Sequence, residues 1–216
     1  MIPVFIIAFN NFTYVRDTVN QLLKYTSDIY IVDNCSSFIP LLEYYDEIKE
    51  NIKIVRMDKN YGSEVCNNPI IQALIPGEFY CITDPDLKFN KNLPIDFIDK
   101  LAHISKKYNS LKVGFALDIQ TDIDDTIIDN FGRSIKECES RYWDHNVKDD
   151  EYAELYWAEI DTTFCLNNKS GLYQHIRVGG DFTAIHRPWL TYWKDEIPTD
   201  ELDFYKKTSI CSTWIS

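Results

Sequence analysis

Two aspartates one residue apart, Asp84 and Asp86, are the side chains of this sequence best placed to do chemistry. They follow the apolar, β-prone run 79–83, and Pro85 between them cannot continue a strand ladder. In an open α/β sheet, ligands bind outside the carboxyl ends of the strands, so both carboxylates are expected at such an edge. Two hard oxygen donors suit Mg²⁺ or Mn²⁺, which also bind phosphate oxygens. For this segment alone, an ordinary acidic turn remains the alternative.

Short β-prone runs recur along the first half of the chain, separated by segments with apolar residues at helical spacing. This alternation is typical of a parallel sheet with crossover helices. We therefore expect an α/β fold with a mostly parallel central sheet and flanking helices. The expected strands are 4–9, 29–32, 52–57, 79–83 and 113–117, and the expected helices are 14–25, 39–48 and one beginning within 67–74.

Polar residues follow the first three expected strands. Asn10 and Asn11 follow the first, the cluster 33–37 follows the second, and Asn60 and Gly62 follow the third. These residues could cap the helices that come next. They could also form the rim of a crevice at the carboxyl edge of the sheet. Both interpretations stay open at this point.

The pattern becomes irregular after residue 117. An acid-rich segment, 118–129, precedes a mixed segment, 138–151, and a strand-like run, 153–166. An irregular tail with several glycines is expected after that run. The sequence has no internal repeat, low-complexity tract or Gly/Ser linker, so we expect one domain over 1–216.

Charge and length exclude several classes of protein. The 216 residues include 34 acids and 22 bases, a formal charge of −12, which argues against a nucleic-acid partner. A divalent ion can still bring a phosphate ligand to an acidic protein. The apolar stretch 1–9 is too short to span a membrane and lacks the basic start of a signal peptide. It is expected to be a core strand, and no membrane span is expected.

The six cysteines show no metal-binding or disulfide pattern. They lie at positions 35, 66, 81, 138, 165 and 211, without a C-x-x-C pair or a cluster with histidines. Free thiols in a reducing compartment are expected, which indicates a soluble cytoplasmic protein. Apolar surroundings predict burial of Cys66, Cys81, Cys165 and Cys211.

Three common phosphate or nucleophile motifs are absent from the sequence. It contains neither G-x-G-x-x-G after the first strand nor a P-loop, so phosphate binding must depend on a metal. It also lacks the G-x-S-x-G turn of serine hydrolases. The remaining candidates are the acidic edge at 84–86, the polar edge at Asp33, the loop 60–62 and His186.

Six short motifs, in this order along the chain, resemble those of the nucleotide-sugar glycosyltransferases of the GT-A fold. They are 31–34, 60–62, 84–86, 112–117, 160–164 and 184–189. The last three are similar to a family-2-related group of bacterial and viral enzymes, which includes a capsid-glycosylating domain of a large algal virus. The resemblance implies a Rossmann-like nucleotide-binding half, 1–117, and a smaller acceptor-side half, 118–216.

The same resemblance implies roles for residues of the first half. Asp33 would contact the base or ribose, and Ala8, Asn10, Asn60 and Gly62 would lie along the nucleotide. The chain departs from many relatives at 9–11, where they have a proline-rich turn, and at 118–120.

The metal site is implied in the same way. Asp86 would bind the metal directly, Asp84 would support the metal and the nucleotide, and His186 would complete the site. A histidine packed beside Pro188 and Trp189 is the alternative for His186.

The acceptor side requires a base only if the enzyme inverts the anomeric centre. Asp161 is the first candidate, and Glu159, Asp118 and Asp181 remain possible. Asp161 could instead cap the amide of Thr163. In a retaining enzyme it would bind a sugar hydroxyl.

The predicted function is metal-dependent transfer of a sugar from a nucleoside diphosphate sugar, with UDP expected, to a glycan or glycoprotein acceptor. Aromatic residues in the last third of the chain could hold sugar rings, although core packing explains most of them. A sugar nucleotidyltransferase and a noncatalytic binding domain of the same fold are the alternatives. These aromatic residues are Tyr152, Tyr156, Trp157, Trp189, Tyr192 and Trp193.

Overall fold

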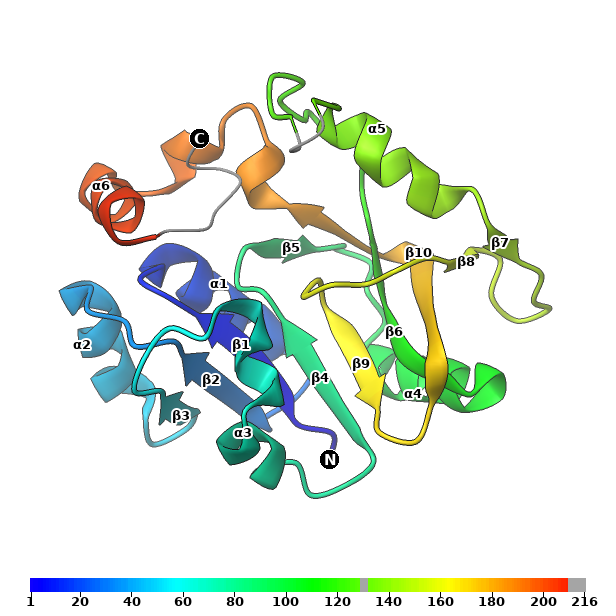
Figure 1. Cartoon of the computed structure of the whole chain (residues 1–216), viewed down its shortest axis with the longest axis horizontal. Coiled ribbons are helices and arrows are strands. Elements are labelled where there is room, and N and C mark those ends of the chain that lie inside the picture. The colour runs from blue at the N-terminus through cyan, green and yellow to red at the C-terminus, as the bar shows by residue number, and fades with distance from the viewer. Residues whose placement is uncertain (129–131, 210–216) are drawn as a thin grey trace.

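A computed structural model describes residues 1–128 and 132–209. In this part of the chain, one twisted sheet of ten strands runs through the molecule, and helices cover it (Figure 1). The α/β fold with flanking helices is confirmed. The strands are β1 (Val4–Ala8), β2 (Ile29–Asp33), β3 (Lys53–Arg56), β4 (Phe79–Thr83), β5 (Leu87–Phe89), β6 (Ser110–Leu117), β7 (Asn146–Val147), β8 (Leu155–Trp157), β9 (Cys165–Asn168) and β10 (Leu172–His186).

The helices connect these strands, and four short 3₁₀ turns lie among them. The α-helices are α1 (Phe12–Leu22), α2 (Ile39–Ile48), α3 (Pro69–Ala73), α4 (Phe97–Tyr108), α5 (Ile135–Ser140) and α6 (Thr199–Thr208). The 3₁₀ turns are η1 (Gly62–Asn67), η2 (Arg141–Trp143), η3 (Arg187–Trp189) and η4 (Trp193–Glu196). The expected helices at 14–25, 39–48 and 67–74 are confirmed as α1, α2 and α3, whereas α4, α5 and α6 were not expected.

The strand order creates a crevice between β1 and β4. The order is β3-β2-β1-β4-β9-β6-β10-β8-β7, and β5 pairs with β10. From β3 to β4 all pairings are parallel, so these strands end at the same edge. The chain first winds from β1 toward β3 and then crosses back to β4. A ligand site is expected where the winding reverses, above the ends of β1 and β4.

The second half of the sheet is mixed. β9 is antiparallel to both β4 and β6, whereas β6 and β10 are parallel. Gly114 of β6 makes this arrangement possible. A β-carbon at this position would overlap the backbone carbonyl of Phe164 and the Cys165 side chain. The close approach of β9 to β6 therefore requires glycine here.

Two expectations for the second half are wrong. The run 153–166 is not one strand: β8 ends at Trp157, a turn follows, and β9 begins at Cys165. The turn forms because the Asp161 carboxylate accepts hydrogen bonds from the amide and hydroxyl of Thr163. The tail after residue 166 is not irregular, because β10 continues for 15 residues.

β10 stays extended because it has partners along its length. It pairs with β6, β8 and β5 in turn, and a shift of register between Val178 and Thr183 bends it. Gly180 lies in this bend with a φ of 60°. The bend carries the strand from the sheet interior to the edge above β4, where His186 ends it.

Helix α6 returns to the N-terminal half, as the red helix beside α1 and α2 in Figure 1 shows. Glu201 is 2% exposed and accepts hydrogen bonds from the amide (2.9 Å) and hydroxyl (2.6 Å) of Thr13. The Phe204 ring packs 5.1 Å from that of Phe38. These contacts hold the end of the described chain beside the loop that follows β1.

Among the described cysteines, Cys35, Cys66, Cys81 and Cys165 are free thiols. Cys66, Cys81 and Cys165 are buried, as predicted, and so is Cys138, whereas Cys35 is exposed. Cys211 lies outside the described residues, as do Asp129 and the last residues of the tail. No helix within the described ranges is both long and apolar enough to cross a membrane.

Candidate functional site

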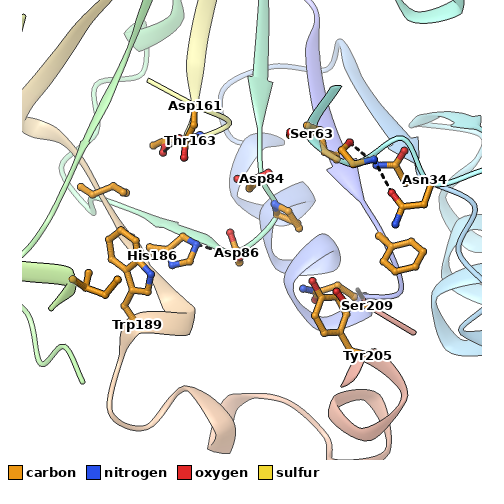
Figure 2. Close-up of a pocket in the computed structure, with 18 of the residues that line it drawn as sticks. Asn34, Ser63, Asp84, Asp86, Asp161, Thr163, His186, Trp189, Tyr205 and Ser209 are labelled. Carbon is orange, nitrogen blue, oxygen red and sulfur yellow. Dashed lines mark hydrogen bonds and ion pairs between the residues drawn. The ribbon is translucent and has the colours of Figure 1, made fainter. Parts of the chain in front are cut away.

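A cavity of about 680 Å³ lies at the carboxyl edge of the sheet, above the ends of β1, β4 and β6. Figure 2 shows its side chains arriving from both halves of the chain. Its position agrees with the reversal of winding between β1 and β4. It is lined by Ile7, Phe9, Asn11, Asn34, Asn60, Gly62, Ser63, Asp84, Pro85, Asp86, Leu117, Ile135, Glu139, Asp161, Thr163, Arg177, His186, Trp189, Tyr205 and Ser209.

Asp86 and His186 lie next to each other in this cavity, with their side chains pointing toward one another (Figure 2). The Nε2 atom of His186 lies 3.4 Å from Oδ2 of Asp86, and both side chains are mostly buried. The backbone also joins them, because Leu87 pairs with His186 and the amide of Arg187 donates to the Asp86 carbonyl at 3.0 Å. β5 and β10 therefore bring together two residues that are 100 positions apart in the sequence.

Two atoms of this pair have no hydrogen-bond partner among the described residues. They are Oδ1 of Asp86 and Nδ1 of His186, and both are buried. Burial would lower the pKa of His186, but the carboxylates of Asp86 and Asp84 outweigh it and raise that pKa. The His186 ring also lies 4.4 Å from that of Trp189, as the packed-histidine alternative expected. The pair thus combines packing with two buried polar atoms that lack partners.

Asp84 lies at the end of β4 and is turned toward Thr162. The hydroxyl of Thr162 donates to Oδ2 of Asp84 at 2.5 Å, and the Asp84 amide donates to the Thr162 carbonyl. Burial, followed by the charge of Asp86, raises the pKa of Asp84 well above its usual value. When both are ionised, the carboxylates of Asp84 and Asp86 repel each other, because burial leaves little water to screen their charges.

These residues fit a divalent cation in part. Within the described ranges, no group of three or more His, Cys, Asp or Glu side chains lies close enough together to hold a metal. Mg²⁺ and similar ions are often held by only one or two carboxylates, with substrate phosphates and water completing the shell. The unpartnered Asp86 oxygen and the raised pKa of Asp84 are what a nearby positive charge would relieve.

Polar groups of two loops form the opposite wall of the cavity. The side-chain nitrogen of Asn34 donates to the Gly62 carbonyl at 3.0 Å, and its side-chain oxygen accepts from the backbone amide of Tyr61 at 3.2 Å. Gly62 has a φ of 62°, a value that suits glycine, and its amide donates to Asn60. These contacts order the loop after β3 against the end of β2, with Ser63 beside Asn34 in the cavity (Figure 2).

The structure does not bring three of the predicted nucleotide-binding residues to the cavity. Ala8, Asn10 and Asp33 are buried and do not line it. The Asp33 carboxylate accepts from Arg56 Nε at 3.0 Å, and also from the Tyr45 hydroxyl. The neighbouring residues Asn11 and Asn34 line the cavity in their place.

The side chain of Asn10 holds the loop after β2. Its oxygen accepts from the amides of Ser37 and Phe38, and its nitrogen donates to the Thr208 hydroxyl of α6. Asn10 thus has a visible structural role at the rim.

Asp161 lines the cavity from the turn between β8 and β9. Burial would raise its pKa, but hydrogen bonds from the amide and hydroxyl of Thr163 lower it below its usual value, with help from Arg177 and His186. Both Thr163 contacts are made with Oδ1, at 3.1 and 2.9 Å. The carboxylate is therefore ionised at neutral pH and has a second oxygen to offer.

The three alternative bases lie elsewhere. Glu159, Asp118 and Asp181 do not line this cavity. The carboxylate of Asp118 accepts from the Thr121 hydroxyl and the Gln120 amide, and Asp181 is exposed.

Two pairs of lining residues were not anticipated from the sequence. Glu139 of α5 and Arg177 of β10 form a buried ion pair at 2.9 Å. The two residues come from two different segments that were both expected to be irregular. Tyr205 and Ser209, from α6 and just after it, reach the cavity from the end of the described chain. No local pattern marks these residues, because each contacts the cavity only through tertiary packing.

Comparisons with known proteins agree with this geometry. The model of glycosyl transferase family 2 matches residues 4–111, half of the chain. TuaG of Bacillus subtilis (strain 168), provisionally named as a glycosyltransferase of teichuronic acid biosynthesis, is 29% identical over 90 residues, which are 39% of this chain and 35% of TuaG. The match thus spans about a third of that relative's length.

Among solved structures, the crystal structure of GalNAc-T7 with UDP, GalNAc and Mn²⁺ shares the fold. Its TM-score is 0.57 with 14% identity, over 85% of this chain and 43% of that chain. S. aureus TarS, residues 1–349, has a TM-score of 0.47 and 15% identity, over 78% of this chain and 47% of that chain. On the strength of the family model, this chain belongs to glycosyl transferase family 2.

Proposed function

We propose that this protein transfers a sugar from a nucleoside diphosphate sugar, with UDP as the nucleotide, to a hydroxyl group of a glycan or glycoprotein. One observation carries the proposal. A single cavity at the carboxyl edge of β1 and β4 combines a paired carboxylate and imidazole, Asp86 and His186, with an ionised carboxylate, Asp161. Membership of the family and the fold shared with a UDP- and Mn²⁺-bound enzyme support the same reaction.

In this proposal Asp86 and His186 would hold a divalent cation, Mn²⁺ or Mg²⁺, and Asp84 would support it. The cation would offset the negative charge that develops on the leaving diphosphate. Asn34, Asn60, Gly62 and Ser63 lie across the cavity, where polar and backbone groups can bind the nucleoside. Ala8, Asn10 and Asp33 would support that wall, since each lies beside a lining residue or holds a loop of the rim.

Asp161 takes the proton of the acceptor in an inverting transfer. The bond between the anomeric carbon and the β-phosphate oxygen breaks, and its electron pair leaves with the nucleoside diphosphate. The acceptor oxygen forms the new bond to the anomeric carbon as its proton passes to Asp161. Thr163 positions the carboxylate by holding Oδ1, which keeps Oδ2 for the acceptor.

The wider parts of the proposal follow from the same assignment. Residues 1–117 form the donor half and 118–216 the acceptor half of a single domain, although His186 and Tyr205 reach back to the donor side. A cytoplasmic, reducing location and a relationship to a viral capsid-glycosylating domain stay predictions.

Thermal unfolding with UDP and Mn²⁺ tests the proposed function. At a UDP concentration of about 100 times its Kd, mass action adds about 2.7 kcal/mol of stability, which raises the Tm of a chain of this size by roughly 5–10 °C. UDP with EDTA should give a much smaller shift. Equal shifts with and without Mn²⁺ would remove the metal from the proposal, and no shift in either case would contradict the proposed function.

A further inference from the structure

A second cavity, of about 340 Å³, lies directly beside the first. The two cavities share Glu139, Asp161 and Arg177. The second is formed by the start of β6, by α5 and η2, by the turn 159–161 and by the first half of β10. It is lined by Leu111, Lys112, Glu139, Tyr142, Glu159, Ile160, Asp161, Tyr173, His175 and Arg177.

We propose that this second cavity binds a neutral, hydroxyl-rich sugar ring of the acceptor glycan. The inference rests on the proposed transfer reaction, because it specifies which acceptor that reaction uses. It assigns a sugar-binding role to residues outside the donor cavity, above all Tyr173 and Glu159.

The position of Asp161 connects this cavity with the reaction. Its side chain lines both cavities, at the place where they meet. A glycan that lies in the second cavity therefore has one end near the carboxylate proposed to take the acceptor proton. An acceptor that approached Asp161 from another side would leave the second cavity empty during the transfer.

Tyr173 gives the cavity the exposed aromatic surface that a sugar ring requires, whereas the Tyr142 ring is already covered by arginine. Tyr173 is 82% exposed, and its ring lies 5.2 Å from that of His175, which also lines the cavity. Tyr142 lies under the guanidinium group of Arg177 at 4.1 Å. The C–H faces of sugars pack on aromatic planes, and a tyrosine can add a hydrogen bond through its hydroxyl.

The charges favour a neutral ligand over an acidic one. Both cations of the lining have protein partners. Lys112 donates to the carbonyls of Ile160 (3.0 Å) and Asp161 (3.1 Å), and Arg177 donates to Glu139 and to the Glu159 carbonyl (2.8 Å). Three carboxylates face these two cations: Glu139, Glu159 and Asp161. A carboxylate or phosphate on the ligand would be repelled, whereas sugar hydroxyls can donate to the acids.

His175 supplies a donor to the same cavity. Its Nδ1 accepts from the Ile160 amide at 3.2 Å, so the proton of the neutral ring is on Nε2. Burial, with the nearby charge of Lys112, lowers its pKa and keeps the ring neutral at pH 7. Nε2 is buried and has no hydrogen-bond partner among the described residues. A sugar oxygen would satisfy this donor once the side chains that cover Nε2 move aside.

A glycan array in the presence of UDP and Mn²⁺ tests the proposal. The array carries neutral oligosaccharides together with sialylated and sulfated ones, and the full chain is applied to it. The Kd of the best neutral oligosaccharide is then measured by calorimetry for the wild type, Tyr173→Ala, Glu159→Gln and Tyr192→Ala. Tyr192 is the matched control: it is among the aromatic residues considered for sugar binding from the sequence, but it is an exposed tyrosine (41%) that lines neither cavity.

We expect binding to neutral oligosaccharides, a loss of about tenfold or more with Tyr173→Ala, and no change with Tyr192→Ala. Glu159→Gln should weaken the same binding, and the Kd of UDP should be unchanged in all three variants. No binding to any oligosaccharide, binding to acidic ones only, or wild-type affinity of Tyr173→Ala would overturn the proposal. Failure of UDP binding alone would instead contradict the transfer reaction and leave the sugar subsite standing.

Discussion

Asp86 is the residue on which the proposed donor chemistry depends most. It is 7% exposed, one of its oxygens faces His186, and the other has no partner among the described residues. Such an oxygen costs stability unless something binds it, since burying an unsatisfied polar atom is unfavourable. A buried carboxylate with an unpartnered oxygen is therefore better suited to binding a ligand than to stabilising the fold.

Replacement of Asp86 by alanine should therefore separate metal binding from folding. We expect Asp86→Ala to remain folded and to lose the Mn²⁺-dependent part of the Tm shift caused by UDP. Asp99→Ala is the control, because Asp99 is an exposed acid of α4 that lines neither cavity. A full Mn²⁺-dependent shift in Asp86→Ala would show that the metal is held elsewhere.

Asp161 belongs to the acceptor side, and its replacement should affect a different measurement. Asp161→Asn keeps the size of the side chain and an oxygen for Thr163 but removes the base, so transfer should slow by about 10²-fold or more while UDP binds normally. Asp181→Asn, an exposed acid outside both cavities, should transfer at the wild-type rate. If the two variants transfer at equal rates, Asp161 has a structural role only.

At the scale of elements, the approach of β9 to β6 determines where the Asp161 turn lies. Residue 114 allows no side chain, since a β-carbon would overlap the backbone of the chain segment that leaves this turn. The position of Asp161 thus depends on one close contact between two antiparallel strands.

Gly114→Ala tests this dependence. The added methyl group must push β9 away, which should cost about 1–3 kcal/mol of unfolding free energy in urea. Gly77→Ala is the matched control, because a β-carbon at Gly77 would meet nothing within 4 Å. It should leave stability unchanged or raise it slightly. Equal stability of the two variants would mean that the strands adjust without cost.

Helix α6 contributes to the cavity, although no motif in its sequence indicates a functional site. It is amphipathic and carries Glu201, which receives two hydrogen bonds from Thr13 at the start of α1. Through this contact and the packing of the Phe204 ring against Phe38, Tyr205 becomes part of the cavity wall.

At the scale of the whole molecule, the protein carries a formal charge of −12, and some of its acidic side chains are buried. Burial raises the pKa of Glu139 and of Glu201. In both cases the folded state binds a proton more tightly than the unfolded state does. The contribution of these two groups to the free energy of unfolding must then fall as the pH rises from the ordinary glutamate pKa through the raised values.

We therefore expect the Tm to fall as the pH is raised from about 5 to 8, with a smaller fall in Glu201→Gln, which keeps the hydrogen-bonding shape without the charge. Glu50→Gln, at an exposed position, controls for the loss of one net charge. The measurement is the slope of Tm against pH at constant ionic strength. A slope for Glu201→Gln that equals the slope for Glu50→Gln would contradict the assignment to Glu201.

The sequence by itself determined the parts of this protein that depend on local periodicity. Apolar alternation and helical spacing specify β1 to β4 and α1 to α3, because each of these elements buries one continuous face. The Asp84–Asp86 corner could be found for the same reason, since a proline and two acids end an apolar run. The resemblance of spaced motifs added His186, and the polar break in the strand-like run 153–166 indicated Asp161.

Only the tertiary structure decided which polar residues face the cavity. Asp33 and Asn34 are neighbours with similar side chains, yet Asp33 turns to Arg56 and Tyr45 while Asn34 lines the cavity. The second half escaped prediction because β10 stays extended through its pairings with β5, β6 and β8. Long-range pairing, the Glu139–Arg177 ion pair and the return of α6 leave no periodic trace in the sequence, because their stabilising partners lie far away along the chain.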